Sequence, residues 1–427
     1  MKIIIVNYRY FFSGGPERYL FNITDLLQKN GHTVIPFSIK HAKNEFTPYE
    51  EYFLDPIGTG KEVYANEYDK TNFDTLKKTF GRMLYSFEAK KKLEILIRAV
   101  KPDIIYVLHY QNKISASIFD AAVKYKIPVV NRISDFGQMC SNALLFRPKQ
   151  KDICERCVQG NKLNAVVNKC VQDSYVYSAM KAASLVIAEQ IVHTKTKINA
   201  FVVPSGFTLK KMAEYGFDVN KMHHIPTFFS GKNNSVATNI SYKNFALFIG
   251  RIEVEKGLFT LINAFVDTDY HLKIIGFSTD GYDVTLQQFL KGKKHNIEFL
   301  GKKGFDEIVP YLRECAFTIV PSECYDNFPN SLIESYAFQK AVIATNLGSL
   351  KEMVNDSETG LLFKPKDAND LQNKVSFLFN NPALSKLYGN NGYHKLLSEY
   401  SAETHYKKLM YVFNKVLKVG IKNSVNV

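Results

Sequence analysis

The chain has 427 residues, a formal net charge of +14, 46% hydrophobic residues and 22% charged residues. This length is too great for one ordinary core and predicts two domains of a globular protein. The sequence contains no run of about 18 apolar residues that would predict a membrane span, and the apolar run in Met1–Asn7 is too short for a signal peptide. We therefore expect a cytoplasmic protein.

Short β-branched runs alternate with helical stretches along the whole chain, a pattern typical of βαβ units and parallel sheets. Two series of such runs predict an α/β fold with two doubly wound, Rossmann-like domains facing a central cleft. We expect an N-terminal domain over 1–227, a C-terminal domain over 228–400 and a final helix over 401–427 that packs back on the first domain. The polar stretch Ser230–Asn244 has the composition of a linker. The expected strands are Lys2–Asn7, His32–Phe37, Asp103–Leu108, Pro128–Arg132, Leu185–Ala188 and Ala200–Val203, then Phe245–Ile249, Leu272–Ile275, Ile297–Leu300, Phe317–Val320, Val342–Thr345 and Gly360–Phe363.

A glycine pair follows the first strand. Gly14 and Gly15 precede Pro16, which suits the start of a helix, and they let the backbone approach a ligand closely. Taken alone, such a pair is often only a turn. The spacing is not that of a dinucleotide-binding glycine motif.

The positive charge is concentrated in the first half of the chain. Residues 1–227 carry 32 Lys and Arg against 21 Asp and Glu, a balance of +11, whereas residues 228–427 carry 23 against 20. Nucleic acid, anionic lipid and an anionic acceptor could each account for this charge, but no nucleic-acid-binding motif accompanies it. The segment Leu76–Lys92 mixes lysines with Phe, Met, Leu and Tyr. It is either an interfacial segment or an amphipathic helix packed on the sheet.

Four of the six cysteines cluster in the first half, with the spacing Cys140-x13-Cys154-x2-Cys157-x12-Cys170. This set could supply a structural zinc site with four thiolate ligands. Free thiols and redox chemistry are the alternatives, because disulfides are disfavoured in a reducing cytosol. No catalytic metal is expected.

The second half places two cations after its first strand. Arg251 follows the strand Phe245–Ile249, and Lys256 precedes the next helix. Residues at the carboxyl end of a strand in a doubly wound sheet face the ligand crevice. An Arg fork and a Lys ammonium could hold a diphosphate there, although a surface Arg and Lys at such a turn are common.

A second motif follows the strand Phe317–Val320. Asp326 lies in the loop, Pro329 is expected at the first position of a helix, and Glu334 lies more than one turn into it. Free amides in the first turn, at Asn330 and Ser331, favour an anion. One carboxylate could hold sugar hydroxyls and the other ribose hydroxyls, or the two could only cap a helix and pair with a surface cation.

Together, Gly-Arg-x4-Lys-Gly and Pro-Ser…Asp-x7-Glu resemble the retaining glycosyltransferases of family 4, which have the GT-B fold. The resemblance implies that Arg251, Lys256 and Glu334 bind the nucleoside diphosphate of a sugar donor. It further implies that the sugar faces Asp326 and the turn that follows, which consists of Asn327, Phe328, Pro329, Asn330 and Ser331. Gly14 and Gly15 resemble the family's cleft-lining glycine loop, and a subset of the family carries a similar cysteine-bearing insertion, here about 136–175.

The chain departs from the family pattern at two positions. The family's usual Glu-x7-Glu has Asp326 at its first position, and Ser134 stands where members often have a His, followed by Asp135. His109 is another candidate for the cleft. We name Asp326, Asp135 and His109 as candidate catalytic residues. The resemblance implies that the leaving phosphate oxygen deprotonates the incoming hydroxyl, so that catalysis is mainly positioning and charge stabilisation.

These observations favour a retaining glycosyltransferase that moves a sugar from a nucleoside diphosphate to a glycan or lipid-linked acceptor in surface polysaccharide synthesis. Its location would be cytoplasmic, with peripheral contact to an anionic membrane. The rival hypotheses are a nucleotide-sugar epimerase of the same fold, a non-catalytic nucleotide-sugar-binding protein and, last, a nucleic-acid binder. The sequence does not select the sugar, the base, the linkage or the oligomeric state.

Overall fold

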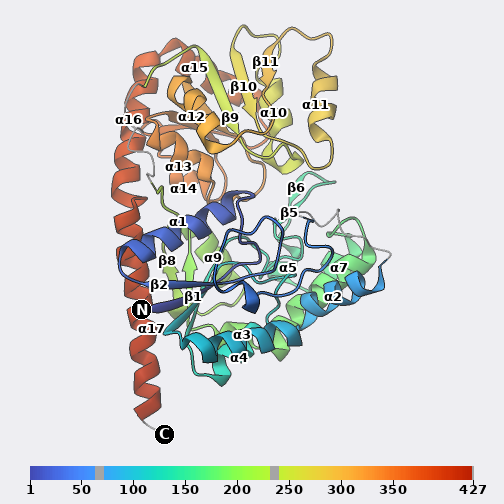
Figure 1. Ribbon diagram of the computed structural model, residues 1–427. Helices are drawn as coiled ribbons and strands as arrows, with labels where there is room; N and C mark the ends of the chain where they lie inside the picture. The colour runs from blue at the N-terminus through green and yellow to red at the C-terminus, as the bar shows by residue number, and fades with distance from the viewer. Residues whose placement is uncertain (63–71, 231–239, 426–427) are drawn as a thin grey trace.

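The computed structural model describes residues 1–62, 72–230 and 240–425, with side chains up to residue 418. It has an α/β architecture with one six-stranded parallel sheet in each half of the chain. Figure 1 shows the two sheets in separate layers, one above the other, with helices around each. The predicted fold class is confirmed. Most of the expected linker, residues 231–239, lies outside the described residues.

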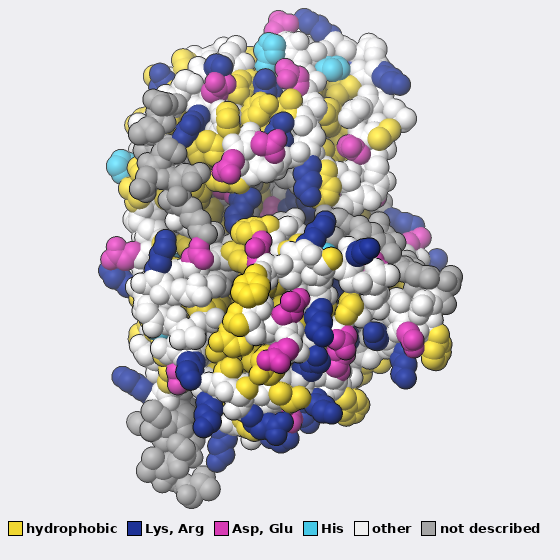
Figure 2. All heavy atoms as spheres, viewed as in Figure 1, with side chains coloured by type: hydrophobic (Ala, Val, Ile, Leu, Met, Phe, Trp, Pro, Cys, Tyr) yellow, Lys and Arg dark blue, Asp and Glu magenta, His cyan; other side chains and the backbone are white. Residues whose placement is uncertain are grey.

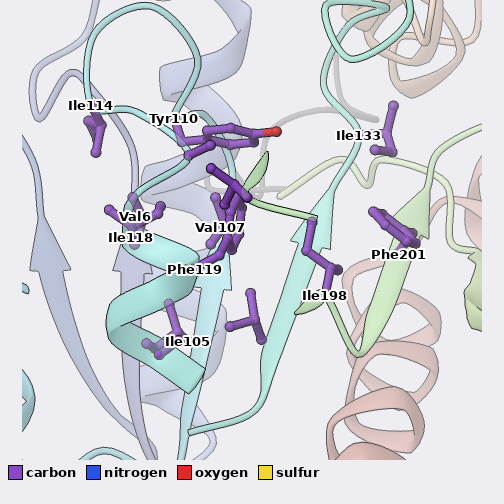
Figure 3. Close-up of a cluster of buried hydrophobic side chains, with 14 of the residues drawn as sticks. Val6, Ile105, Val107, Tyr110, Ile114, Ile118, Phe119, Ile133, Ile198 and Phe201 are labelled. Carbon is purple, nitrogen blue, oxygen red and sulfur yellow. The ribbon is translucent and has the colours of Figure 1, made fainter. Parts of the chain in front are cut away.

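The N-terminal sheet has the strand order β2-β1-β3-β4-β7-β8, and all its neighbouring strands are parallel. Its central strands are buried on both faces, as their continuous apolar runs require. Figure 3 shows side chains of these strands meeting the helix α4 (Ile118–Lys124) in the core. The strands are β1 (Lys2–Val6), β2 (Thr33–Phe37), β3 (Ile104–Val107), β4 (Val129–Arg132), β7 (Ala200–Val203) and β8 (Met222–His224).

Besides α4, the helices of this half are α1 (Gly15–Lys29), α2 (Phe73–Leu84), α3 (Phe87–Val100), α5 (Arg156–Gln159), α6 (Leu163–Val167), α7 (Tyr175–Val186), α8 (Thr194–Lys197) and α9 (Gly206–Glu214). Short 3-10 turns lie at Glu50–Tyr52 and Val219–Lys221. A small antiparallel hairpin, β5 (Phe146–Arg147) and β6 (Asp152–Ile153), lies in the cysteine-bearing stretch.

One predicted strand is wrong. Leu185–Ala188 lies at the end of α7 and in the π-helical turn Ile187–Ile191 that continues it. A short apolar run does not distinguish a strand from a buried helix segment. The sixth strand of the sheet is instead β8, whose Met-His-His sequence lacks a strand signature.

The C-terminal sheet has the order β11-β10-β9-β12-β13-β14, the arrangement of a doubly wound dinucleotide-binding sheet. Its strands are β9 (Phe245–Ile249), β10 (His271–Ile275), β11 (Asn296–Phe299), β12 (Phe317–Val320), β13 (Ala341–Thr345) and β14 (Gly360–Phe363). Its helices are α10 (Leu258–Asn263), α11 (Tyr282–Leu290), α12 (Phe305–Glu314), α13 (Asn330–Ala337), α14 (Leu350–Met353), α15 (Ala368–Asn380) and α16 (Pro382–Glu399), with the 3-10 turn η5 (Val254–Lys256) after β9.

The last helix, α17 (Ala402–Val425), runs beside the N-terminal domain (Figure 1). Its apolar face, with Leu409, Val412 and Phe413, lies in the same buried cluster as Ile3 and Leu20 of the first domain. No described helix is both long and apolar enough to cross a membrane.

Candidate active site

Two adjoining cavities lie where the two domains meet. The first cavity, of about 390 Å³, is bounded by the starts of α1 and α13 and by the loops after β4, β9 and β12. The second cavity, of about 730 Å³, shares Arg18, Arg251 and Glu334 with the first and extends along the loops after β10 and β11. Figure 2 shows this hollow between the domains, with Lys and Arg side chains at its edge. We call the two cavities together the cleft.

The loop after β9 carries the first pair of predicted donor ligands. Arg251 lines both cavities and Lys256 lines the first one, as a loop at the carboxyl end of this sheet allows. Gly257 ends the loop with φ +70°, and a Cβ there would lie 2.0 Å from the carbonyl oxygen of Pro321. The glycine therefore lets this loop pack directly against the loop after β12. That contact brings the two halves of the predicted site together.

Lys256 is paired with Asp326 across these two loops. The Lys256 ammonium donates a hydrogen bond to the Asp326 carboxylate, and both side chains are mostly buried. Burial alone would lower the pKa of Lys256, but the Asp326 charge raises it above its ordinary value. The lysine is therefore charged at neutral pH, as binding a diphosphate would require.

Arg251 is held by acids of its own loop. Its Nη1 lies 2.6 Å from a Glu253 oxygen and its Nη2 lies 3.9 Å from Glu255. Burial, together with a hydrogen bond to Glu255, raises the pKa of Glu253 to about 7. The Arg251 side chain is 50% exposed, so its attraction does not offset these two effects. Sequence reasoning missed this acid pair, although it stands between Arg251 and Lys256.

Glu334 is buried in α13 and meets a cation from the other domain. Arg18, on the first turn of α1, donates to Glu334 Oε1 and lies with its guanidinium 5.0 Å from the Phe305 ring centroid. Burial lowers the pKa of Arg18. Sequence reasoning missed Arg18, although it follows Gly15 by three residues and so shares its helix face.

The glycine loop contacts the donor turn across the cleft. A Cβ on Gly15 would lie 2.8 Å from Asn330 Nδ2, so the absence of a side chain lets α1 and α13 approach closely. Gly14 is the N-cap residue of α1 and lines the second cavity.

The turn before α13 differs from the prediction in two respects. The helix begins at Asn330, so Pro329 is the cap residue and not the first helical residue. Asn327 uses its side chain on the other domain, since Oδ1 accepts from Thr208 Oγ1 at 2.7 Å and Nδ2 donates to the Ile133 carbonyl at 2.9 Å. All five residues of the turn, Asn327, Phe328, Pro329, Asn330 and Ser331, line the first cavity.

His109 and Asp135 lie together but do not line the described cleft. His109 Nε2 is 3.5 Å from Asp135 Oδ2, at the ends of neighbouring strands. Burial alone would raise the pKa of Asp135, but the hydrogen bond from His109 and its charge hold it below the ordinary value. The N-terminal wall of the first cavity is formed instead by Arg132, Ser134 and Thr227.

The four cysteines predicted as zinc ligands lie close together but are not arranged as a metal site in the described structure. Cys140, Cys154, Cys157 and Cys170 line one small cavity, but within the described residues no three His, Cys, Asp or Glu side chains are grouped closely enough to hold a metal ion. The Cys140 thiol donates to Asn142 Oδ1 at 3.0 Å, as a protonated thiol does. Burial raises the pKa of Cys157 and of Cys170 to about 11. No disulfide joins the four residues.

Part of the chain is similar in sequence to known glycosyltransferases. Residues 232–395 match the model of the family described as "Glycosyl transferases group 1". The chain is 34% identical over 210 residues to an uncharacterized glycosyltransferase of Methanocaldococcus jannaschii, covering 49% of this chain and 57% of the relative. It is 27% identical over 181 residues to the capsular polysaccharide biosynthesis glycosyltransferase CapM of Staphylococcus aureus, covering 41% and 47%. The chain thus spans about half the length of each of these two relatives.

The solved structures show the same fold. The chain aligns with Anabaena Alr3699/HepE, solved in complex with UDP-glucose, at a TM-score of 0.64 and 16% identity, over 97% of this chain and 100% of that one. The fold is GT-B, as predicted. In sequence, the similarity to the glycosyl transferases group 1 lies in residues 232–395.

Proposed function

We propose that this chain is a retaining glycosyltransferase that moves a sugar from a nucleoside diphosphate to a glycan or lipid-linked acceptor in polysaccharide biosynthesis. One observation carries the proposal: Arg251, Lys256 and Asp326, from two strand-to-helix loops, and Glu334 of α13 line one cavity between the domains. Two cations and two carboxylates are the groups that a diphosphate and a polyol require. The capsular polysaccharide relative supports the polysaccharide setting.

Each group has a distinct role in this proposal. Arg251 and Lys256 bind the diphosphate and stabilise the charge that develops as it departs. Glu334 accepts hydrogen bonds from the ribose hydroxyls, and Asp326 faces the sugar. The bond between the anomeric carbon and the phosphate oxygen breaks, the acceptor oxygen bonds to that carbon on the same face, and its proton passes to the leaving phosphate.

A donor panel tests the proposal. Purified protein is mixed with UDP-, GDP-, ADP- and dTDP-linked sugars, and the melting temperature and donor hydrolysis are measured. At least one donor should raise the melting temperature by mass action and be hydrolysed slowly. Lys256→Met and Arg251→Gln should each weaken that binding about tenfold or more, whereas the exposed control Lys294→Met should not. No response to any donor would overturn the proposal, and conversion of the sugar without an acceptor would indicate an epimerase instead.

The acceptor side of the proposal includes contact with an anionic membrane through α2 and α3. Phe73, Lys77 and Phe80 lie at i, i+4 and i+7 on α2 and are all exposed, with Phe73 77% exposed. On α3, Phe87 is 77% exposed and Lys91 follows it by one turn. Apolar rings flanked by lysines are typical of a helix that lies at a lipid interface.

The two acidic residues of α3 are paired within the domain, and α2 carries one acid, the exposed Asp74, against three Lys and Arg residues. Glu88 accepts from the buried Arg82 at 2.9 Å, and Glu94 accepts from Lys124 of α4 at 2.8 Å. Both carboxylates are thus neutralised within the domain. One face of each helix packs in the domain, and the other face is basic and apolar. The residue pattern therefore supports both an amphipathic helix that packs in the domain and a segment that lies at a membrane interface.

Vesicle sedimentation tests the membrane contact. The protein should sediment with vesicles containing 30% phosphatidylglycerol and not with pure phosphatidylcholine. Phe73→Ser/Phe87→Ser and Lys77→Glu/Lys91→Glu should each reduce the bound fraction several-fold, because each change removes one of the two attractions. The matched control Lys291→Glu/Lys294→Glu changes charge equally on the other domain. Equal loss in that control would show that only overall charge matters.

A further inference from the structure

Arg132 is a buried cation on the N-terminal wall of the first cavity. It is the last residue of β4 and is only 7% exposed. Its Nη1 donates to Ser134 Oγ at 2.9 Å and its Nη2 to Thr227 Oγ1 at 2.7 Å. The guanidinium carbon lies 3.9 Å from the centroid of the Tyr19 ring, and Nε has no hydrogen-bond partner.

Arg132 forms no ion pair with any described residue, which is unusual for a guanidinium buried this deeply. Arg82, at 2% exposure, shows the ordinary arrangement, because its Nη2 donates to the carboxylate of Glu88 and to the carbonyl of Asp55. A buried charge without a counter-ion is strongly destabilising. The unpaired Arg132 guanidinium at the wall of a cavity therefore points to a counter-ion that belongs to a bound ligand.

The polar groups around Arg132 cannot supply the missing negative charge. The Tyr19 hydroxyl lies 2.8 Å from the Tyr106 hydroxyl and 2.9 Å from His405 Nε2. Burial raises the pKa of both tyrosines and lowers the pKa of His405 to about 3, so all three groups are neutral at pH 7. The hydroxyls of Ser134 and Thr227 are neutral as well.

We propose that Arg132, with Ser134 and Thr227, forms an oxyanion subsite that binds a phosphate or carboxylate group of a ligand in the cleft. One hydrogen on each Nη and the Nε–H have no acceptor among the described residues, and a guanidinium matches two oxygens of such a group. This subsite belongs to the N-terminal domain and is distinct from Arg251 and Lys256 of the C-terminal domain. The inference rests on the proposed function only in taking the cleft as the ligand site.

Three sources could supply the oxyanion, and three calorimetric titrations separate them. UDP against UMP tests the second phosphate of the donor. UDP-glucuronate against UDP-glucose tests a carboxylate on the donor sugar. Inorganic phosphate added to protein saturated with UDP tests an anion carried by the acceptor. Each titration is made on the unaltered protein, on Arg132→Gln, on Arg132→Lys and on the exposed control Arg98→Gln.

In at least one titration the unaltered protein should bind the more anionic ligand of the pair more tightly, or bind the added phosphate. We call this the anion preference. Arg132→Gln should reduce it about tenfold or more, as expected for the loss of a charge-assisted hydrogen bond. Arg132→Lys should retain part of it, because the charge remains while the fork is lost, and Arg98→Gln should retain all of it. The proposal is overturned if Arg132→Gln keeps the same preference in all three titrations, or if Arg132→Gln unfolds and Arg132→Lys, while folded, shows no loss.

Failure of the proposed function has a different signature. If neither the unaltered protein nor Arg132→Gln binds UDP or any other nucleotide of the donor panel, the donor proposal fails, and inorganic phosphate is then titrated alone. If the unaltered protein binds phosphate and Arg132→Gln does not, the oxyanion subsite is still supported. If both bind phosphate equally, or neither binds it, the oxyanion subsite is refuted.

Discussion

The acid pair beside Arg251 makes the stability of the protein depend on pH in a direction that can be worked out. Burial and the hydrogen bond to Glu255 raise the pKa of Glu253 from 4.5 to about 7. The folded protein therefore holds a proton that the unfolded chain releases above pH 4.5. The stabilisation from this proton is fully present below pH 4.5 and is lost as the pH rises through 7. Glu253→Gln cannot ionise and removes the effect.

The size of the effect follows from the pKa shift. A rise from 4.5 to about 7 corresponds to about 3 kcal/mol, as an upper bound for an acid pair that shares one arginine. The Glu253 side chain is 14% exposed, so solvent screening reduces this figure only moderately. The unfolding free energy of Glu253→Gln minus that of the unaltered protein should rise by about 2–3 kcal/mol as the pH goes from 5 to 8.

Urea unfolding of both proteins at pH 5, 6.5 and 8 measures this difference. Glu298→Gln, at an exposed acid on β11, serves as the control and should show no pH-dependent gain. A second measurement follows from the position of Glu253 beside Arg251. Above pH 7 the ionised Glu253 competes with a diphosphate for Arg251, so the affinity for UDP should fall more steeply with pH in the unaltered protein than in Glu253→Gln. A stability gain of equal size at pH 5 and pH 8 would refute the reasoning.

Three further predictions concern the contacts around the cleft and the cysteine cluster. Arg18→Ala should cost about 2 kcal/mol of unfolding free energy, because it leaves the buried carboxylate of Glu334 without its cation, and the cost should shrink in a Glu334→Gln background; equal costs in both backgrounds would exclude the pairing. Gly257→Ala should cost about 3 kcal/mol or abolish folding, since its Cβ would lie 2.0 Å from a backbone oxygen; unchanged urea unfolding would contradict this. With pKa values of about 11, Cys157 and Cys170 should react with a maleimide about tenfold faster for each pH unit from 7 to 9, and fast labelling at pH 7 would count against buried free thiols.

Much of the fold was predictable because its strands carry their own signal. β1, β3 and β12 are continuous β-branched or aromatic runs, as strands buried on both faces require. The exceptions were segments whose state depends on tertiary contacts. Leu185–Ala188 reads as a strand but continues a helix, and β8 reads as a loop but completes the sheet. Local propensity decides neither case.

The candidate site also contains residues that the sequence predicted and residues that it did not. Arg251, Lys256 and Glu334 were predicted to lie together because they follow the neighbouring strands β9 and β12 of one domain, and the three line one cavity. Their partners were not, because Arg18 lies 316 residues from Glu334 in the sequence and meets it only when the domains dock. Arg132 was missed for a related reason. Its lack of a carboxylate partner is a property of the folded surroundings and leaves no trace in a single sequence.

The charges of the cleft are arranged so that the proposed donor would act on the contact between the domains. Without a donor, Lys256 is held by Asp326 within the C-terminal domain, whereas Glu334 is held by Arg18 of the N-terminal domain. A ribose that takes the Glu334 carboxylate must compete with that interdomain ion pair, while a diphosphate offers Arg18 a new anionic partner on the cavity that both line. The interdomain hydrogen bonds of Asn327 to Thr208 and Ile133 involve no charged group, so a change of partner at Glu334 or Arg18 does not affect them. Under the proposed function, donor binding would change the Arg18–Glu334 contact and leave the Asn327 contacts in place, a condition that allows a hinge motion without separation of the domains.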